Sequence, residues 1–359
     1  MIPSRSLALL AALTALLVPA AAGHGATGDS RRGDDDAHRG RAGVLSREFQ
    51  RDIYNGGTQF LGADGITYDA APLAVPGLDG ELFYGADFDV ACGLGGTASP
   101  AMSKMSKLAA LIEKSGRAVI WTAGPSKTSV LSNKIDKTTL PHGNCDRVGL
   151  KAQSHFIDHV KDPTFLPLRR LLASDPRQVY FKSDPHWTTV GASVFAQEVA
   201  RRLSPKVARK QRYVYGTETR NGLFNSLRGI DAPETAETAL PADKVRIKTA
   251  KDSVEDWPGY PNVVFDHSWN TKPAGRSIPG HSLLLGDSFM LYALASMRPL
   301  FHHGRFMWVD HVRTHDVIQA IKHSDTVVIE ILQTFLPLAQ VMVTSTFRKQ
   351  LKKALAGKH

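Results

Sequence analysis

The segment from His281 to Met297, HSLLLGDSFMLYALASM, is the most informative one about the fold of this chain. Its first half, Ser282–Leu285, is short and apolar and predicts a buried strand, and its second half has the apolar spacing of a helix. Gly286 follows the strand and lets the backbone turn sharply. A buried strand that passes through a tight turn into a helix is the unit from which parallel sheets are built.

Helices and strands alternate on both sides of this stretch. Met102–Lys114 has helical spacing and ends at Gly116, and Arg117–Pro125 (RAVIWTAGP) follows as a short buried strand. The further predicted elements are a helix at Pro167–Ala173, a strand at Val179–Phe181, a helix capped by Thr188 or Thr189 with the apolar face Val190, Val194, Phe195, Val199 and Leu203, a strand at Arg305–His311, a helix at His315–His323 and a strand at Asp325–Leu332. The alternation predicts an α/β fold, a three-layer sandwich with a mainly parallel central sheet.

The N-terminus predicts export. Arg5 precedes the apolar run Leu7–Gly23, which ends in small residues as a secretory signal peptide does. We therefore expect a signal peptide at 1–23, a disordered linker at 24–44 and a periplasmic or extracellular location. A signal segment that stays uncleaved and keeps the chain at the membrane is the alternative.

Composition gives the remaining boundaries. Residues 45–80 are rich in glycine and predict an irregular N-terminal arm, 81–345 the folded domain, and 346–359 a basic, exposed tail. Within the domain, Ser204–Arg276 has mixed charge, prolines and little periodicity, so we expect long loops or a small insertion there.

The charge balance indicates the kind of partner. The 359 residues include 44 Lys and Arg against 34 Asp and Glu, a formal net charge of +10. Such an excess favours acidic partners. Export argues against nucleic acid and favours an anionic surface polymer, while a scattered, solvated set of charges is the alternative.

The two cysteines, Cys92 and Cys145, predict one disulfide, because an exported protein folds in an oxidising compartment. Closing that loop would stabilise the fold by roughly 4 kcal/mol in the chain-entropy model. A catalytic thiol is the alternative, but neither cysteine lies in a local Cys/His motif.

Two short motifs place reactive side chains at predicted strand ends, where open parallel sheets carry their functional groups. In GDSF, Gly286 and Asp287 are turn and oxyanion candidates, and Ser288 presents a hydroxyl at a helix N-terminus. In DPHW, Asp184 can orient His186 so that its Nε2 addresses Ser288 Oγ. Each motif alone also fits a plain helix cap or turn, but the pair predicts a Ser–His–Asp triad.

GDSF preceded by DPHW resembles the SGNH-hydrolase-like domain of the alginate O-acetyltransferase family, the AlgJ and AlgX type, in which the D-x-H block comes before the GDS block. Three further segments are similar to that family: its opening segment in ELFYG (81–85), its strand and P-x-K segment in GRAVIWTAGPSKTSV (116–130), and its closing strand in SDTVVIEIL (324–332). The similarity spans roughly residues 81–338.

The chain departs from the family pattern at two positions. Pro185 stands where relatives often have threonine, and the arginine that often follows the closing Glu330 is not evident in ILQTF. A C-terminal carbohydrate-binding module, which some relatives carry, is not expected.

The resemblance implies a reaction. Ser288 attacks an acetyl donor, and a polysaccharide hydroxyl resolves the acetyl-enzyme; His186 moves the protons and Asp184 holds His186. It also implies an acidic or neutral polysaccharide acceptor, a membrane-bound acetyl-donor protein and no cofactor. SGNH enzymes usually complete their oxyanion hole with an asparagine. The candidates are Asn221, Asn225, Asn262 and Asn270.

Other residues have two interpretations each. Lys127 either contacts an anionic substrate or belongs to a turn, and Trp187 either stacks on sugar or packs beneath the site. The spacing of a histidine cluster matches no closed zinc pattern, so we expect no metal site. Its members are His302, His303, His311 and His315.

Two other functions stay open at this point. A secreted carbohydrate or lipid esterase would use the same triad with water as the acceptor, since the outcome depends on how well the site excludes water. A non-catalytic surface-binding protein is the third possibility, and the complete set of Asp184, His186 and Ser288 argues against it.

Overall fold

The computed structural model describes residues 59–93, 98–242, 246–247, 251–257, 260–272, 276–309, 312–336, 342 and 344–356. The predicted signal peptide and linker and His311 lie outside these residues. Within these ranges, no helix combines the length and the apolar character needed to cross a membrane.

A seven-stranded sheet forms the centre of the molecule, in the order β5–β13–β11–β12–β10–β8, with β9 paired to β10. The pairs from β5 to β12 are parallel, and β10 adds antiparallel to β12. The bounds are β5 (Ala118–Gly124), β13 (Thr326–Leu332), β11 (Ile278–Gly286), β12 (Phe301–Trp308), β10 (Tyr260–Lys272), β9 (Lys251–Trp257) and β8 (Arg246–Ile247).

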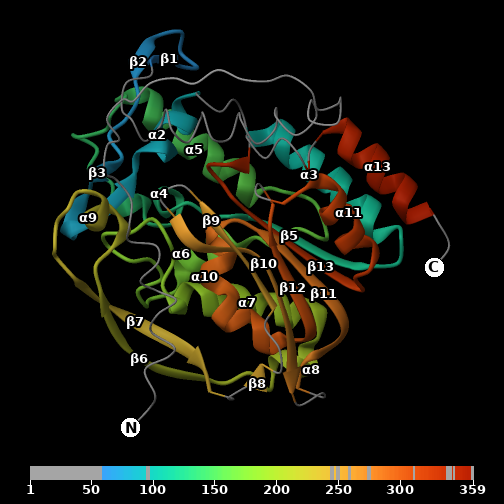
Figure 1. The fold of residues 1–359 in the computed structure, drawn as a ribbon. Helices are drawn as coiled ribbons and strands as arrows, with labels where there is room; N and C mark the ends of the chain where they lie inside the picture. Colours follow the sequence, from blue (N-terminus) through green and yellow to red (C-terminus); the bar gives the residue numbers. More distant parts are fainter. Residues whose placement is uncertain are drawn as a thin grey trace, which may run out of the picture.

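Helices cover both faces of the parallel strands (Figure 1). Successive residues of a strand point to opposite faces, so Leu283 and Leu285 pack into one apolar core and Leu284 into the other. The helices of the first core are α3 (Ala98–Glu113), α11 (Thr314–Lys322) and α13 (Ser345–Ala356). The helices of the second core are α6 (Leu168–Ser174), α7 (Thr189–Leu203) and α10 (Ser288–Met297). The predicted three-layer α/β sandwich is confirmed.

The N-terminal part adds short pairs and helices beside this sandwich. The strands β1 (Gln59–Leu61) and β2 (Thr67–Asp69) pair antiparallel, as do β3 (Ala74–Pro76) and β4 (Leu82–Tyr84). The helices here are η3 (Leu78–Gly80), α2 (Gly85–Cys92), α4 (Lys127–Val130), η4 (Ser132–Lys134) and α5 (Asn144–Asp158). Cys92 and Cys145 form the predicted disulfide, which joins α2 to α5.

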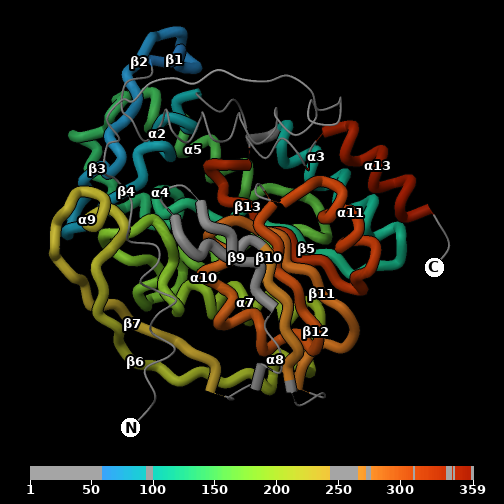
Figure 2. Tube along the Cα trace, in the orientation of Figure 1, coloured from blue at the N-terminus to red at the C-terminus, as the bar shows by residue number. Residues whose placement is uncertain are grey.

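Ser204–Arg276, predicted to hold long loops or a small insertion, is largely strand where the structure describes it. The prediction of long loops is wrong, whereas the hairpin formed by the first part of this segment fits the predicted small insertion. After α8 (Pro205–Ala208), β6 (Tyr213–Arg220) and β7 (Glu234–Pro241) pair along their whole length and enclose α9 (Leu223–Leu227). Figure 2 shows this hairpin as a yellow arm outside the central sheet. Most of its side chains are exposed or half-buried, so its sequence lacks the apolar run of a core strand.

Of the residues predicted as an exposed tail, 346–356 belong to the fold as part of α13. Helix α13 is basic, but Phe347 and Leu351 lie one turn apart on one face and are buried in the first core. Its lysines occupy the solvent side. The remaining short element of the described chain is η5 (Arg298–Leu300), between α10 and β12.

Candidate active site

Ser288 is the first residue of α10 and follows the carboxyl end of β11. The preceding Asp287 fixes the turn, because its Oδ1 accepts the Phe289 N–H at 2.8 Å and its Oδ2 accepts the Leu332 N–H at 2.7 Å. Its carboxylate is therefore directed at backbone amides of α10 and β13. Asp287 acts as a helix cap and turn residue rather than as an oxyanion donor.

Position 286 has no room for a side chain, so it requires glycine. A Cβ atom at this position would lie 2.4 Å from the Cβ of Met290 and 3.0 Å from Glu330 Oε2. Met290 stands where a GxSxG motif would have its last glycine, and here it packs against the turn instead. The turn candidate Gly286 is thus explained by the close approach of helix and strand.

The loop that carries Asp184 and His186 is not preceded by a sheet strand, so the prediction of a strand at Val179–Phe181 is wrong. Tyr180 forms an isolated antiparallel bridge with Trp187. The Phe181 N–H donates to the His186 carbonyl at 3.3 Å, closing a tight loop. Thr188 then caps α7 as predicted, its side chain accepting the Gly191 N–H. The short apolar run serves packing instead of sheet formation.

This loop places the predicted residues in contact. The Asp184 Oδ1 atom lies 2.7 Å from His186 Nδ1 and accepts the His186 N–H at 2.9 Å. His186 Nε2 lies 2.8 Å from Ser288 Oγ, although the two residues are 102 positions apart in the chain. A hydroxyl, an imidazole and a carboxylate in this order can remove a proton from the hydroxyl and hold the resulting imidazolium.

Asp184 is fully buried, and both of its oxygens are occupied. Its Oδ2 accepts Arg220 Nη2 at 2.8 Å and the Leu223 N–H at 3.1 Å. Burial alone would raise the pKa of Asp184, but the charge and hydrogen bonds of His186 and the charge of Arg220 lower it to about 2. The carboxylate is therefore ionised at neutral pH.

Tyr292 supports the other side of the imidazole. Its ring stacks on the His186 ring with centroids 4.1 Å apart and an interplanar angle of 3°. Its hydroxyl accepts Arg220 Nη2 at 3.3 Å. The sequence prediction missed both residues. Tyr292 could have been found, since it lies one helical turn after Ser288, but nothing in the sequence links Arg220 to the site.

Two buried carboxyl groups, those of Asp287 and Glu330, lie side by side at the turn before α10. Glu330, on β13, is fully buried beside Asp287. Burial raises the pKa of Glu330 well above its usual range, and the Asp287 charge adds to this effect. Its Oε1 would lie 2.0 Å from a Cβ at Gly124, so glycines on two neighbouring strands leave room for this carboxyl.

The possible role of Lys127 as a contact for an anionic substrate is wrong. Its ammonium donates to the carbonyls of Leu82, Phe181 and Lys182 at 2.8, 2.6 and 2.7 Å. It also pairs with Glu81 at 2.8 Å, and the residue is only 1% exposed. The ammonium is therefore enclosed by the protein and holds β4 against the loop before Asp184, and it does not face a substrate.

Of the two roles considered for Trp187, stacking on sugar and packing beneath the site, the structure supports packing. The side chain is fully buried and contacts the rings of Phe195 and Phe289, with centroids 5.6 and 5.0 Å apart. It has no surface on which a sugar could stack. It supports the site from below, since Phe289 also contacts the His186 ring at 4.9 Å.

None of the described oxyanion candidates among the asparagines contacts the triad. Asn221 and Asn225 donate to the carbonyls of Ile230 and Ala232, and Asn270 pairs with His303. The side chain of Asn262 lies outside the described residues. These amides form hydrogen bonds within a loop or between neighbouring strands, so they do not serve as oxyanion donors.

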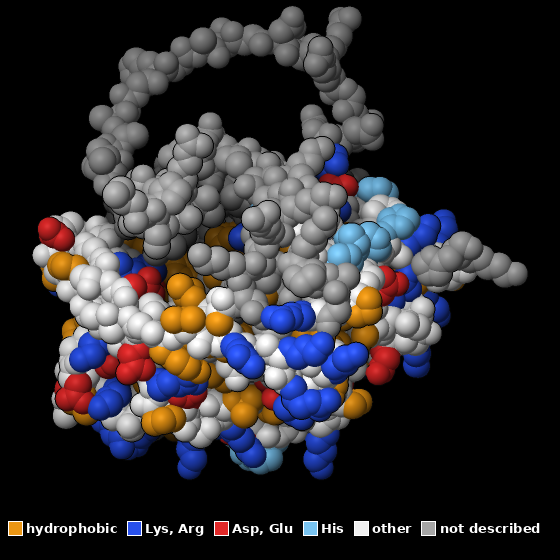
Figure 3. Space-filling view, turned by 90° about the horizontal axis from the view of Figure 1, so that it is seen from below, with side chains coloured by type: hydrophobic (Ala, Val, Ile, Leu, Met, Phe, Trp, Pro, Cys, Tyr) orange, Lys and Arg blue, Asp and Glu red, His pale blue; other side chains and the backbone are white. Residues whose placement is uncertain are grey.

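The histidine cluster lies at the other end of the sheet. His302 Nδ1 pairs with the Thr271 carbonyl at 2.9 Å, and His303 stacks on His281 with centroids 5.0 Å apart. His315 is exposed on α11. Figure 3 shows histidine side chains gathered on one face, among scattered lysines and arginines. His281 pairs with His303 five residues before Gly286 in β11, so the cluster is separate from Ser288.

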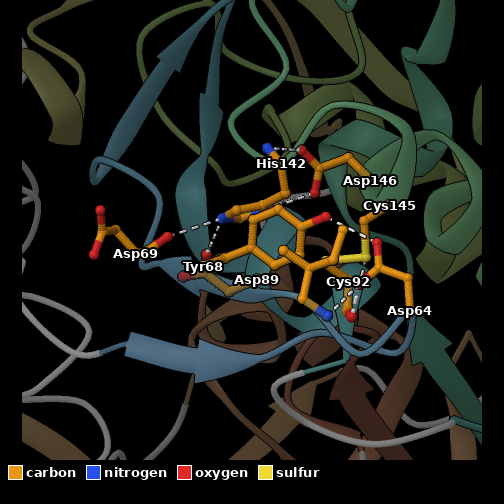
Figure 4. Close-up of a disulfide and its surroundings, with 9 residues drawn as sticks. Asp64, Tyr68, Asp69, Asp89, Cys92, His142, Cys145 and Asp146 are labelled. Carbon is orange, nitrogen blue, oxygen red and sulfur yellow. Dashed lines mark hydrogen bonds and ion pairs between the residues drawn. A yellow bond between two sulfur atoms is a disulfide. The ribbon is translucent and has the colours of Figure 1, made fainter.

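A cluster of acidic side chains and one histidine, His142, surrounds the disulfide (Figure 4). His142 Nδ1 pairs with Asp146 Oδ1 at 2.8 Å, and potential ligand atoms of Cys92, His142 and Asp146 lie within 4.8 Å of one another. The Cys92 sulfur is bonded to Cys145 and cannot act as a thiolate. This set therefore does not fit a zinc site.

The chain is therefore an SGNH-hydrolase-like α/β sandwich, in which a serine, a histidine and an aspartate are in contact at the carboxyl end of the sheet. Residues 74–256, half of the chain, match the family described as "SGNH hydrolase-like domain, acetyltransferase AlgX". The chain belongs to this acetyltransferase family, as the order of its D-x-H and GDS motifs predicts.

Three solved structures are similar in fold. PatB1 of Bacillus cereus has 17% sequence identity and a TM-score of 0.47, covering 67% of this chain and 90% of that one. The O-acetyltransferase domain of Pseudomonas putida AlgJ has 17% identity and a TM-score of 0.42, covering 78% and 98%. Pseudomonas aeruginosa AlgX has 13% identity and a TM-score of 0.46, covering 79% and 66%. No curated protein matches the chain.

Proposed function

We propose that this protein is an exported O-acetyltransferase that moves acetyl groups onto hydroxyls of a cell-surface or extracellular polysaccharide. The observation that carries the proposal is the 2.8 Å contact between Ser288 Oγ and His186 Nε2, with Asp184 on the other imidazole nitrogen. Membership of the acetyltransferase family supports acetyl as the transferred group. The apolar N-terminal segment supports export.

The reaction has two halves. Ser288 Oγ attacks the carbonyl carbon of the acetyl donor while His186 Nε2 takes its proton, and the same proton then goes to the leaving group of the donor. An acetyl-serine ester results. An acceptor hydroxyl then attacks this ester, His186 removes the hydroxyl proton, and the proton returns to Ser288 Oγ as the acetylated sugar leaves.

The position of Ser288 also suits the oxyanion that forms in each half. As the first residue of α10, it has a backbone N–H at the positive end of the helix dipole. A donor at this place stabilises the negative charge that develops on the carbonyl oxygen. Asp287 keeps the turn in place by bonding α10 and β13.

The charge of the chain favours an acidic acceptor. The net charge of +10 raises the local concentration of a polyanion such as a uronic-acid polymer, whereas a neutral polymer gains nothing from it. An exported enzyme has no cytosolic acetyl donor, so we propose that a membrane-bound partner protein delivers the acetyl group.

The test combines an activated acetyl ester, p-nitrophenyl acetate, with purified protein and either a mannuronic-acid oligosaccharide, a neutral glucan oligosaccharide or no acceptor. Acetate release and acetylated sugar are followed by mass spectrometry. We expect transfer to exceed hydrolysis with the acidic acceptor. Ser288→Ala should lower both by on the order of 10⁶-fold.

Two outcomes would contradict the proposal. Acetate as the sole product with every acceptor would make the protein an esterase that uses water. Unchanged turnover in the folded Ser288→Ala protein would exclude the triad altogether.

A further inference from the structure

The β6–β7 hairpin ends against the loop that carries the aspartate and the histidine. At this end Arg220 of β6 and Glu234 of β7 are direct cross-strand partners. Glu234 accepts the N–H of Lys182 at 2.5 Å and the N–H of Ser183 at 2.8 Å, and Arg220 binds Asp184. One pair of hairpin residues thus holds three consecutive residues of the loop.

The chain after the hairpin strand approaches the loop just as closely. A Cβ atom at Gly222 would lie 2.1 Å from Ser183 Oγ and 2.3 Å from the Ser183 carbonyl oxygen, so only glycine fits. The next residue, Leu223, donates its N–H to Asp184. The loop is therefore contacted both by Glu234, the cross-strand partner of Arg220, and by Gly222 and Leu223, which follow Arg220 in the chain.

Arg220 itself is held between two rings. Its guanidinium lies 4.5 Å from the ring centroid of Phe181 and 5.5 Å from that of Tyr292. Its side chain is 16% exposed. Two aromatic faces and two oxygen partners restrict the guanidinium to one orientation, which a flexible ammonium would not keep.

The contacts have a consequence for the base. Arg220 and the Leu223 N–H occupy Asp184 Oδ2, so Oδ1 is left for His186. The positive charge of Arg220 also competes with the imidazolium for the Asp184 charge. Tyr292 joins the two groups, since its ring stacks on His186 and its hydroxyl accepts from Arg220.

We propose that Arg220 is a positioning residue of this site: it orients Asp184 and, through Asp184 and Tyr292, sets the tautomer and the basicity of His186 toward Ser288. The inference rests on the proposed function, because it concerns the same triad. It assigns to the β6–β7 hairpin the task of holding the base in place. Arg220 acts through other residues and does not touch the reacting atoms.

The experiment compares Arg220→Met, Arg220→Lys and the exposed control Arg209→Met in the full mature chain. Two readouts are used: the rate at which phenylmethylsulfonyl fluoride labels Ser288, followed by mass spectrometry between pH 5 and 9, and kcat and KM for p-nitrophenyl acetate. Thermal unfolding shows that each variant is folded. Labelling depends on nucleophile activation and needs no acceptor sugar.

We expect Arg220→Met to lower the labelling rate and kcat by about 10- to 100-fold, less than the roughly 10⁴-fold lost when an aspartate of such a triad is replaced. KM should stay close to the wild-type value. The pH of half-maximal labelling should rise, because removing the Arg220 charge strengthens the attraction of Asp184 for a protonated imidazole. Arg220→Lys should restore the pH profile and part of the rate, and Arg209→Met should match the wild type.

Three results would overturn the inference. Arg220→Met with the wild-type rate and pH profile would leave Arg220 a purely structural residue. A raised KM with unchanged kcat would make it a substrate contact. If Ser288 of the wild-type protein is not labelled at all, the proposed function fails first, and the inference fails with it.

Discussion

His186 and His142 occupy similar surroundings in two regions of the molecule. Each ring places Nδ1 against an aspartate, Asp184 at 2.7 Å and Asp146 at 2.8 Å, and each aspartate also accepts the backbone N–H of its histidine, at 2.9 and 2.7 Å. All four residues are buried. The two pairs differ in what the other ring nitrogen meets.

His186 Nε2 faces the Ser288 hydroxyl, whereas His142 Nε2 faces the Asp69 carbonyl at 3.1 Å and Asp89 at 3.3 Å. A hydroxyl can give up a proton and become a nucleophile, but a carbonyl oxygen and a second carboxylate only accept. Of the two pairs, the one at His186 faces a group that it can deprotonate, and the one at His142 does not.

The two regions also differ in their balance of charge. Against the effect of burial, the charge and hydrogen bonds of His186 and the charge of Arg220 lower the pKa of Asp184 to about 2, whereas burial raises the pKa of Asp89 to about 6. Burial alone would lower the pKa of His142, but the hydrogen bond and charge of Asp146 raise it. The first region therefore keeps an ionised carboxylate beside His186, and the second holds His142 between Asp146 and Asp89.

The largest effect should separate the two histidines by activity. His186→Gln removes the base and should lower acetyl-ester turnover by about 10⁴- to 10⁶-fold. His142→Gln should leave kcat close to the wild-type value, because its ring does not contact the triad. Kinetics with p-nitrophenyl acetate on folded proteins measure both. Equal losses of activity in the two variants would contradict the different roles of the two histidines.

Removing the disulfide should affect the His142 region through stability. Cys92→Ser with Cys145→Ser opens a loop of 53 residues, and the chain-entropy model gives a loss of about 4 kcal/mol in the free energy of unfolding. Urea unfolding measures the loss. Below the unfolding transition kcat should not change, and a matching fall in kcat would show that this region does support the catalytic one.

Lys127 is the corresponding support on the catalytic side. Lys127→Met leaves Glu81 buried without its partner, and breaking such a pair should cost about 3 kcal/mol or more in the free energy of unfolding. KM for an acidic acceptor should stay unchanged, because the ammonium faces the protein. The exposed Lys182→Met serves as the control. A higher KM with unchanged stability would restore Lys127 as a substrate contact.

The smallest effect should be in the pH dependence of the His142 region. The pKa of His142 is raised in the folded state, so its contribution to stability is fully present below the unfolded-state value of about 6.5 and is lost as the pH rises through the folded value. The difference in unfolding free energy between wild type and His142→Gln should therefore be larger at pH 5.5 than at pH 8.5. A difference that does not change with pH would contradict the ionised pair.

The elements whose pattern is local could be predicted from the amino-acid sequence. The apolar runs of β5, β11 and β13 and the helical spacing of α3 and α7 predicted the sandwich, and the even cysteine count predicted the disulfide. Asp184, His186 and Ser288 were found because two motifs in a known order flank the predicted turns. Each of these features depends on residues close together in the chain, which is where periodicity and turn chemistry act.

The features that depend on contacts between distant segments could not be predicted in this way. The β6–β7 hairpin has no apolar run because most of it faces solvent, and Val179–Phe181 forms no sheet strand although its residues favour one. Arg220 reaches Asp184 across 36 positions and Tyr292 across 72, and Lys127 became buried through carbonyls 45 to 55 positions away. A side chain's partner depends on which surfaces pack together, and that follows from the energy of the whole fold rather than from any one segment.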